Sequence, residues 1–453
     1  MNVRATEQST QIDYKFWHPM CHPGEWKQRE RLNIVKSDGL YVWDDKGNKM
    51  VDGFAGLWCV NVGHGRPEVK EAIVKQMNEQ IYGQLFEGVM HPRAADLAEK
   101  LVQMTAQEGM ARVLYGTGGS DGVETALKIA RQYWRVQGMA GRTKFISLKN
   151  AYHGVHFGGA SVTGINAFRL NYEPVLAGCY QVDTPWLDRN PWTENPEELG
   201  RICADMLERE IIQQGPETVA AFIAEPVQGA GGVIVPPANY WPLVRAVCDK
   251  YGILLIADEV VTGFGRSGCL FGSRGWGVKP DIMVFAKALT AGYIPLSATM
   301  LNQRIADAFE NNADFRGVML TGYTYGGHPL GCAAALAVLD IVEKEDLPGN
   351  AARIGDYMMQ RLKPFEARFR SVGNVRGKGL MFAIDLVQDK KTREMLAPTD
   401  DLSWRLAAAT REAGAVIRPV GSKLVIAPPL VLDQARADVI VDALESAFVA
   451  IDR

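Results

Sequence analysis

Short runs of consecutive apolar residues, separated by stretches of helical length, fill the middle of this 453-residue chain. Continuous rather than alternating apolarity marks strands that are covered on both faces of a sheet. The runs lie at residues 113–115, 144–147, 219–224, 253–257, 281–286 and 296–301, and helices are expected between them at 122–136, 196–214 and 240–250. Because strands that alternate with helices form a mostly parallel sheet, the pattern predicts an α/β fold.

The two ends of the chain have a different pattern. Residues 40–43 and 49–52 read as a hairpin around the turn 44–48, and amphipathic helices are expected at 66–77 and 93–104. After residue 329 an Ala-rich helix through 342 precedes helices near 350–369, 400–413 and 433–449, with strands at 380–386, 416–417 and 423–427. This mixture is typical of a smaller α+β domain.

Composition excludes several classes of protein. With 49 basic and 52 acidic side chains the net charge is −3, so we expect no nucleic-acid partner. The longest nearly uncharged helical run, 331–339, is far shorter than the roughly 20 residues of a membrane span. We see no secretory signal in the first 30 residues and expect a cytoplasmic protein. The seven scattered cysteines predict free thiols, and His18, Cys21 and His22 lack a second ligand pair, so no metal site is expected.

Three of the predicted strands end in an ionisable residue. Run 219–224 leads into Glu225, run 253–257 into Asp258, and run 281–286 into Lys287. The ligand crevice of a parallel sheet lies outside the carboxyl ends of its strands, so the three side chains could meet in one pocket. Alternatively, each residue simply marks the end of a buried strand, and the pattern leaves both interpretations open.

Lys287 stands in an apolar stretch, with Met283-Val284-Phe285-Ala286 before it and Ala288-Leu289 after it. An ammonium ion is poorly solvated there, and the neutral amine is a nucleophile that forms a Schiff base with a carbonyl carbon. Alternatively, the lysine stem crosses the edge of the sheet and its ammonium reaches water, which is the commoner outcome for a lysine without other motifs.

A glycine-rich turn at 116–122 joins the first strand to a helix. Free N–H groups and the positive end of the helix dipole would bind an anion such as a phosphate there. Ser120 or Asp121 could instead cap the helix, with Glu124 completing a capping box, and capping is compatible with anion binding. The spacing matches neither a P-loop nor a dinucleotide fingerprint.

The lysine, the anion turn and Asp258 together suit one kind of cofactor. An aldehyde with a phosphate and a ring nitrogen needs a lysine, an anion cup and a carboxylate that keeps the ring nitrogen protonated. The protonated ring then accepts the electrons that a substrate carbon keeps after losing a proton.

At this point the chain resembles the class III, fold type I pyridoxal-phosphate aminotransferases, in their ω-amino acid or amine:pyruvate branch. The resemblance runs from Gly56 to Pro429 and depends most on AEPVQGAGG at 224–232, DEVVTGFGR at 258–266, the Lys287 segment and GYTYGGHP at 322–329. It implies an α/β fold with a large domain around a mostly parallel seven-stranded sheet and a small α+β domain. The implied division is an N-terminal segment of the small domain at 1–60, a large cofactor-binding domain at 61–328 and a C-terminal small domain at 329–453.

The resemblance also implies roles around pyridoxal 5'-phosphate (PLP). Lys287 would carry the cofactor covalently, and Asp258 would pair with the pyridine nitrogen. Val260 would pack on one face of the ring and Tyr152 on the other. Glu225 would lie near the ring hydroxyl and help to orient it.

Further implied roles concern the phosphate and the oligomer. Gly119 and Ser120 would hold the phosphate, and Thr324 would reach the phosphate in the neighbouring subunit of a homodimer or a larger assembly such as a tetramer. The sequence departs from the family's usual phosphate motif, because residues 117–122 read Thr-Gly-Gly-Ser-Asp-Gly instead of Asn-Ser-Gly-Ser-Glu-Ala. One hydroxyl is lost, and phosphate affinity is expected to be weaker.

Substrate choice would depend on residues that resemble the lining of the family's two substrate pockets, namely Trp58, Phe86, Ala230 and Arg418. Arg418 would bind a substrate carboxylate through its guanidinium fork and swing away when an apolar group occupies the site. Considered alone, Arg418 would more often be a solvated loop cation, and Trp58 and Phe86 would be core aromatics.

The implied activity is a ping-pong aminotransferase (EC 2.6.1.-). Lys287 would move the proton between the donor carbon and the cofactor, and pyruvate would accept the amino group and become alanine. Donors would be ω-amino acids such as β-alanine, taurine-like sulfonates, diamines or primary amines. The alternatives are a 4-aminobutyrate or diamine:2-oxo acid aminotransferase, and an aminomutase or decarboxylase of the same fold. A dinucleotide-dependent oxidoreductase and a non-catalytic scaffold are more distant rivals.

Overall fold

The largest sheet organises the molecule, which we describe from a computed structural model covering residues 15–26, 31–397 and 399–452. Within these residues the sheet has seven strands in the order β4-β10-β9-β8-β7-β5-β6, and only β10 runs against the others. The strands are β4 Met110–Gly116, β5 Lys144–Leu148, β6 Cys179–Val182, β7 Val219–Ala224, β8 Leu254–Asp258, β9 Ile282–Phe285 and β10 Ser297–Asn302. The mostly parallel sheet is therefore confirmed, whereas β6, a short edge strand, was not predicted.

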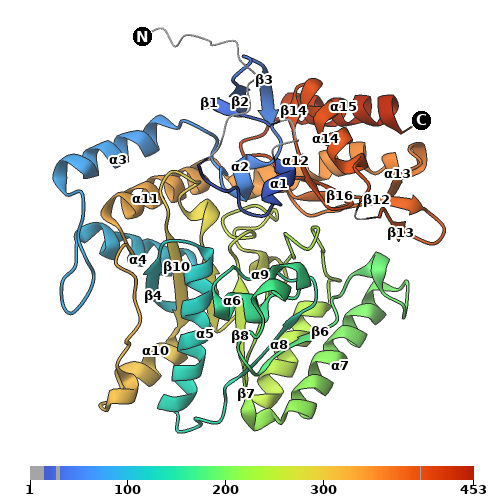
Figure 1. The fold of residues 1–453 in the computed structure, drawn as a ribbon. Coiled ribbons are helices and arrows are strands. Elements are labelled where there is room, and N and C mark those ends of the chain that lie inside the picture. The colour runs from blue at the N-terminus through green and yellow to red at the C-terminus, as the bar shows by residue number, and fades with distance from the viewer. Residues whose placement is uncertain (1–14, 27–30, 398, 453) are drawn as a thin grey trace.

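Helices cover both faces of this sheet, which explains the continuous apolarity of its strands (Figure 1). On β7, Ala221 and Ile223 pack in the cluster that contains α5, whereas Phe222 and Ala224 pack in the cluster that contains α7 and α8. The main covering helices are α4 Pro92–Met104, α5 Gly119–Val136, α7 Pro196–Gln214, α8 Tyr240–Tyr251, α10 Gln303–Glu310 and α11 Pro329–Lys344.

A second body is built from both ends of the chain. β3 pairs in parallel with β14, with Val51 opposite Ala415, so the N-terminal hairpin and the C-terminal segment share a sheet. That sheet contains β1 Ile34–Asp38, β2 Tyr41–Asp44, β3 Lys49–Asp52 and β14 Ala415–Val416. Another sheet contains β11 Val372–Gly377, β12 Phe382–Asp389, β13 Glu394–Met395, β15 Arg418–Val420 and β16 Lys423–Ile426. Four helices accompany them, namely α12 Leu347–Leu362, α13 Phe365–Arg368, α14 Leu402–Glu412 and α15 Gln434–Ile451.

Four of these strands were not predicted, because their side chains give no clear strand pattern. All five residues of β1 are exposed, β11 contains two glycines, β13 has only two residues, and β15 has three residues with a proline in the middle. The predicted helix at 350–369 is divided into α12 and α13, because Pro364 stands between them.

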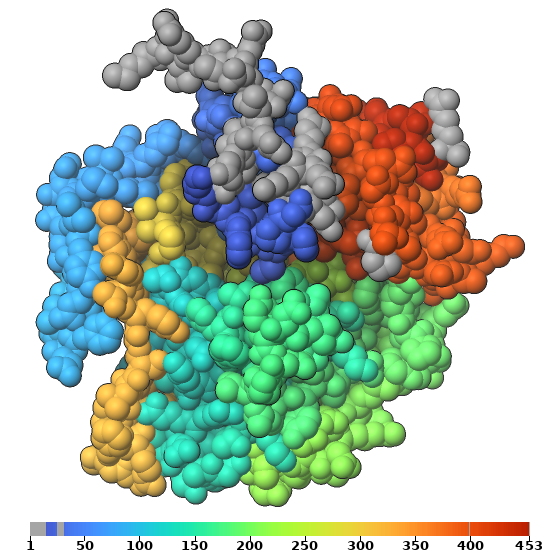
Figure 2. Space-filling model, in the orientation of Figure 1, coloured from blue at the N-terminus to red at the C-terminus, as the bar shows by residue number. Residues whose placement is uncertain are grey.

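An arm projects from the large sheet. It consists of the loop 80–91, between α3 Pro67–Glu79 and α4, and of residues 312–328, between α10 and α11. The Tyr82 hydroxyl donates to the Thr324 carbonyl at 2.9 Å, and His91 Nε2 lies 2.8 Å from the Gly327 carbonyl. Figure 2 shows the two segments side by side at the left edge of the molecule.

The remaining helices are short and lie near the junction of the two bodies (Figure 1). They are α1 Pro23–Trp26, α2 Ala55–Trp58, α6 Phe157–Val162 and α9 Gly272–Gly275. No helix within the described part of the chain is both long and apolar enough to span a membrane.

Candidate active site

The three charged strand ends are neighbours, which favours the first of the two interpretations that the sequence pattern left open. β9, β8 and β7 are adjacent and parallel, Asp258 is the last residue of β8, and Glu225 directly follows β7. Lys287 comes two residues after β9 and begins a single 3-10 turn. The carboxyl ends of the three strands therefore bring two carboxylates and one amine to the same edge of the sheet.

Asp258 is buried, with 4% of its surface exposed, and it is held by two groups. Its Oδ1 accepts the Val260 backbone N–H at 3.1 Å, and its Oδ2 lies 2.8 Å from Nδ1 of His153. The backbone N–H of His153 in turn donates to Thr163 Oγ1 at 2.9 Å. His153 was not predicted as a site residue, although it stands beside Tyr152 in the sequence. The His153 imidazole thus places a proton donor next to the Asp258 carboxylate and fixes the orientation of that carboxylate.

Glu225 accepts two backbone hydrogen bonds but remains an unusually weak acid. Its Oε1 accepts the Tyr152 N–H at 3.0 Å, and its Oε2 accepts the Gly229 N–H at 2.8 Å. Burial nevertheless raises the pKa of Glu225 to about 7, and the nearby Asp258 charge adds to the increase. Burial also raises the pKa of the Tyr152 phenol, with the charges of Asp258 and Glu225 contributing. Tyr152, Glu225 and Asp258 therefore form one electrostatically coupled group.

The glycine-rich turn opens α5 without a side-chain cap. Gly118 is the N-cap residue, so the prediction that Ser120 or Asp121 caps this helix is wrong. Both side chains have other partners: Ser120 Oγ accepts the Val155 N–H at 3.1 Å, and Asp121 Oδ2 accepts the Thr117 N–H at 2.7 Å. The first N–H groups of α5 thus lack a side-chain acceptor, which suits an anion site.

Glu124, the second residue of the predicted capping box, binds the first turn of α6 instead, and Asp121 also contacts His156, the residue before α6. Glu124 Oε2 accepts the Gly158 N–H at 3.1 Å, and His156 Nε2 lies 2.8 Å from Asp121 Oδ1. Burial would raise the pKa of Asp121, but hydrogen bonds from Thr117 and His156 outweigh it, and the pKa is lowered. These contacts tie the loop that carries Tyr152 and His153 to the start of α5.

A close approach favours glycine at position 119. A Cβ on Gly119 would lie 3.0 Å from Cγ1 and 3.2 Å from Cγ2 of Val260. The helix start and Val260 therefore touch, so the glycine-rich turn adjoins the residue that follows Asp258 by two positions.

Lys287 has a strained backbone and no acidic partner. Its φ is +33°, a left-handed value that is costly for a residue with a side chain. Among the described residues no carboxylate forms an ion pair with its amine, and the Cys59 thiol is close enough to feel its charge. The amine is thus available to react.

Trp58 and Arg418 share one aromatic neighbour. The Trp58 ring packs edge-on against Phe54 with centroids 5.2 Å apart, and the Arg418 guanidinium lies 5.4 Å from the Phe54 ring centroid. Burial lowers the pKa of Arg418. Arg418 is therefore a half-buried cation on β15 and not the solvated loop residue that it would more often be on its own.

Ala230 and the arm residues complete the predicted set. Ala230 is exposed in the turn that follows Gly229. Phe86 is 46% exposed in the arm, and a Cβ on Gly322 would lie 3.0 Å from its ring, so Phe86 is not a core aromatic. Thr324 is also exposed in the arm. Tyr323 connects the arm to the glycine-rich turn, because its hydroxyl donates to the Asp121 carbonyl at 3.2 Å.

The donor set fits PLP. Within the part of the chain that the structure describes, it provides a lysine without an acidic partner, a carboxylate that lies between a histidine and a backbone N–H, and a helix start without a side-chain cap that is open to a phosphate. His153 Nε2 is buried and has no hydrogen-bond partner among the described residues. The fold and this site together define a PLP-dependent enzyme of fold type I.

Comparison with known proteins gives the family. The family model "Aminotransferase class-III" matches residues 24–448, and the chain belongs to this family of PLP-dependent aminotransferases. The chain is 41% identical to a diaminobutyrate–2-oxoglutarate transaminase of Halomonas elongata over 91% of this chain and 89% of that protein. It is 39% identical to a putrescine–pyruvate aminotransferase of Pseudomonas aeruginosa over 89% of this chain and 88% of that protein.

Solved structures are similar over almost the whole chain. A PLP-bound amine transaminase from an uncultivated Pseudomonas species superposes with a TM-score of 0.96 at 56% identity, over 97% of this chain and 100% of that one. An (S)-enantioselective omega-transaminase from Thermomicrobium roseum gives a TM-score of 0.92 at 41% identity, over 96% of both chains.

Proposed function

We propose that this aminotransferase moves an amino group from an ω-amino acid, a diamine or a primary amine to pyruvate by a ping-pong mechanism. One observation supports a 2-oxo acid, such as pyruvate, as the acceptor. Arg418 is half-buried beside Phe54 and, among the described residues, forms no ion pair with a carboxylate. A desolvated guanidinium without an acidic partner is unfavourable unless a ligand supplies the anion, and its planar fork matches a carboxylate.

The apolar side of the same pocket supports an amine donor. Phe54 and Trp58 are 5% and 6% exposed and belong to one hydrophobic cluster with Val227 and Val233. A donor carbon chain would pack there, and Arg418 would bind the carboxylate of an amino acid. Two relatives support this donor class, one named for putrescine, a diamine, with pyruvate, and the other for diaminobutyrate, a diamino acid, with 2-oxoglutarate.

In the proposed mechanism the protein positions the cofactor and the substrate and moves one proton between them. PLP supplies an electron-withdrawing ring that stabilises negative charge on the substrate carbon after proton loss. Lys287 would hold the cofactor before reaction and then act as the base and acid that transfers the proton. Asp258, oriented by His153, would keep the ring nitrogen protonated, and Val260 and Tyr152 would cover the two ring faces.

The remaining cofactor roles follow from the same geometry. Gly119 and Ser120, at the uncapped start of α5, would hold the phosphate. Glu225 would orient the ring from its hydroxyl side, since its two oxygens are already fixed by backbone N–H groups.

We further propose a homodimer in which the arm reaches the neighbouring active site. The arm exposes large apolar side chains, which in a monomer would be costly to hydrate. They are Ile81, Tyr82, Phe86, Val89, Met90, Phe315, Val318, Leu320 and Tyr325. Thr324 would contribute to the neighbouring phosphate site, and Phe86 to the neighbouring substrate pocket. A cytoplasmic location stays a prediction.

An amino-donor panel tests the proposal. The PLP-loaded protein is incubated with β-alanine, taurine, 4-aminobutyrate, putrescine, 2,4-diaminobutyrate or a primary aryl-alkyl amine, and alanine formation from pyruvate is measured. A parallel series replaces pyruvate with 2-oxoglutarate and measures glutamate.

We expect alanine from at least one amine or ω-amino acid, and none from the Lys287→Ala variant. Formation of glutamate but not of alanine would indicate that the acceptor is 2-oxoglutarate and not pyruvate. Product formed without any 2-oxo acid would favour an aminomutase or decarboxylase. No amino transfer with any pair would refute the proposal.

A further inference from the structure

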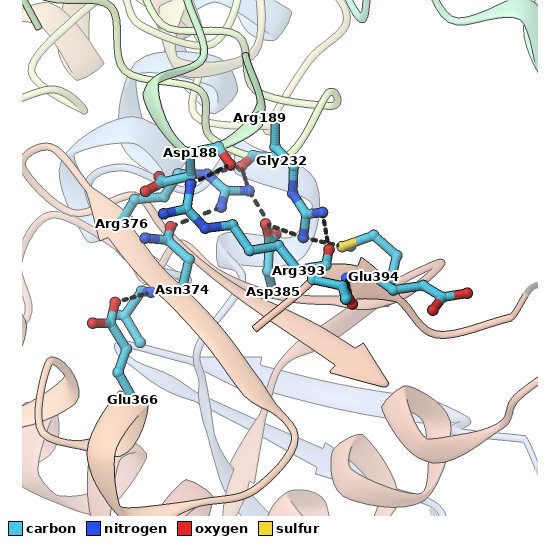
Figure 3. A network of polar contacts seen from close by, with 12 residues as sticks. Asp188, Arg189, Gly232, Glu366, Asn374, Arg376, Asp385, Arg393 and Glu394 are labelled. Carbon is cyan, nitrogen blue, oxygen red and sulfur yellow. Dashed lines mark hydrogen bonds and ion pairs between the residues drawn. The ribbon is translucent and has the colours of Figure 1, made fainter. Parts of the chain in front are cut away.

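A polar network connects the sheet of the small body to the turn that follows β7 (Figure 3). At its centre the Arg376 guanidinium, on β11, donates to the Gly232 carbonyl from both Nε and Nη2, at 2.8 and 2.5 Å. The two residues are 144 positions apart in the sequence. Two donors on one carbonyl fix both the distance and the direction of this contact.

Arg376 is itself held firmly in place. Its Nη2 donates to Oδ1 of the fully buried Asp385 at 2.8 Å, and its Nη1 donates to Asn374 Oδ1 at 3.0 Å. Asn374 and Asp385 are opposite each other in the β11–β12 register, so the three side chains share one face of the sheet. The second oxygen of Asp385 lies 3.5 Å from Arg189 Nη2. A buried, shared carboxylate therefore orients the guanidinium.

The turn at 229–233, whose Gly232 carbonyl binds Arg376, is connected to the candidate active site. Gly232 and Val233 donate their N–H groups to the Gly229 carbonyl at 3.0 and 3.1 Å, which closes the turn that contains Ala230. The N–H of Gly229 donates to Glu225 Oε2, and Glu225 Oε1 accepts the Tyr152 N–H. One chain of hydrogen bonds thus runs from Arg376 to Tyr152.

The contact also leaves no room for adjustment at its centre. Gly232 has a φ of +114°, and a Cβ there would lie 2.6 Å from Lys423 Cδ and 3.1 Å from Arg376 Nη2. The small body therefore contacts the backbone of the turn through the side chains of Arg376 and Lys423, and Gly232 has no side chain of its own in that contact.

We propose that Arg376 is a positioning residue, which sets the turn 229–233 and through it Ala230, Glu225 and the Tyr152 backbone. The placement of the small body is thereby transmitted to the cofactor pocket. The inference rests on the proposed function only where it predicts a change in kinetics, because hydrogen exchange in the turn can be measured without catalysis.

The test compares Arg376→Gln with Arg393→Gln. Arg393 belongs to the same junction, where its Nη1 donates to the Asp188 carbonyl at 3.2 Å, but it forms no bond with the turn (Figure 3). Hydrogen exchange of peptides that cover 226–235 is measured on the cofactor-free protein. We expect the Gly232 and Val233 amides to exchange about tenfold faster in Arg376→Gln and at the native rate in Arg393→Gln.

Steady-state kinetics of the PLP-loaded proteins give the second measurement. We expect Arg376→Gln to raise the KM of the amino donor about fivefold with a smaller change in kcat, and to shift the visible absorption of the bound cofactor. Arg376→Lys keeps the positive charge but not the planar guanidinium fork. Its donor KM and its cofactor absorption should therefore lie between those of Arg376→Gln and those of the native enzyme.

Two outcomes would overturn the inference: native exchange in the turn of Arg376→Gln, or faster exchange with unchanged KM, kcat and spectrum. If Arg376→Gln does not fold, Asp385→Asn, which leaves the guanidinium in place but loosens its anchor, is expected to give the same effects more weakly, and native behaviour would again overturn it. If the native enzyme transferred no amino group, the proposed function would fail while the exchange result still decided whether Arg376 fixes the turn.

Discussion

Replacing Glu225 by glutamine in the cofactor-free protein would measure the cost of burying a carboxylate in this pocket. Burial raises the pKa of Glu225 from an ordinary 4.5 to about 7. Between these pH values the native state binds a proton that the unfolded state does not, so the free energy of unfolding falls as the pH rises. One pKa unit corresponds to roughly 1.4 kcal/mol, so the stability that Glu225 contributes at low pH and loses by about pH 8 amounts to about 3 kcal/mol.

The assay is denaturant unfolding of the native protein and of Glu225→Gln at one protein concentration, from pH 5 to pH 8. Near pH 5 both proteins carry a neutral side chain at 225 in the native state, and their difference reflects only shape and hydrogen bonding. We expect the native protein to lose about 3 kcal/mol relative to the variant by pH 8. Glu79→Gln, at an exposed position, should show no such trend. A difference between the native protein and Glu225→Gln that stayed constant with pH would refute the burial argument.

Other substitutions test the phosphate turn and the substrate side. Gly119→Ala would push a methyl group into Val260, so PLP affinity, measured by titration of the cofactor-free protein, should fall at least about tenfold. Arg418→Met should lower kcat/KM for pyruvate about 10- to 100-fold but leave an uncharged aldehyde acceptor within a few-fold of native, and equal losses for both would contradict the carboxylate role. Asp52 accepts the N–H groups of Phe54 and Gly56 at 3.0 and 2.9 Å. Asp52→Asn should therefore loosen the turn before Trp58 and raise the KM of the amino donor. Native kinetics of this variant would show that the turn holds without the carboxylate.

Local sequence mispredicts side chains that have more than one possible hydrogen-bond partner. Ser120 and Asp121 stand where a helix cap belongs, but the loop at 153–158 and Thr117 compete for them. A cap and a loop contact use the same oxygen atoms, so local sequence cannot decide between them.

The sequence by itself determined the sheet and its charged edge. The position of a residue at a strand's carboxyl end follows from the strand that precedes it. β7 and β9 are apolar throughout, and β8 is apolar up to Asp258, because both faces of these strands are covered. Glu225, Asp258 and Lys287 therefore had to lie at one edge once these strands were parallel neighbours. The family motifs contain the same three residues.

Only the tertiary structure decided which groups support that edge. His153 reaches Asp258 across 105 residues of sequence, Arg376 reaches Gly232 across 144, and Arg418 meets Phe54 only because β15 returns to the N-terminal segment. These contacts depend on how the two bodies pack and on the register of distant strands. A local pattern specifies neither, because burial of the apolar faces selects the arrangement for the chain as a whole.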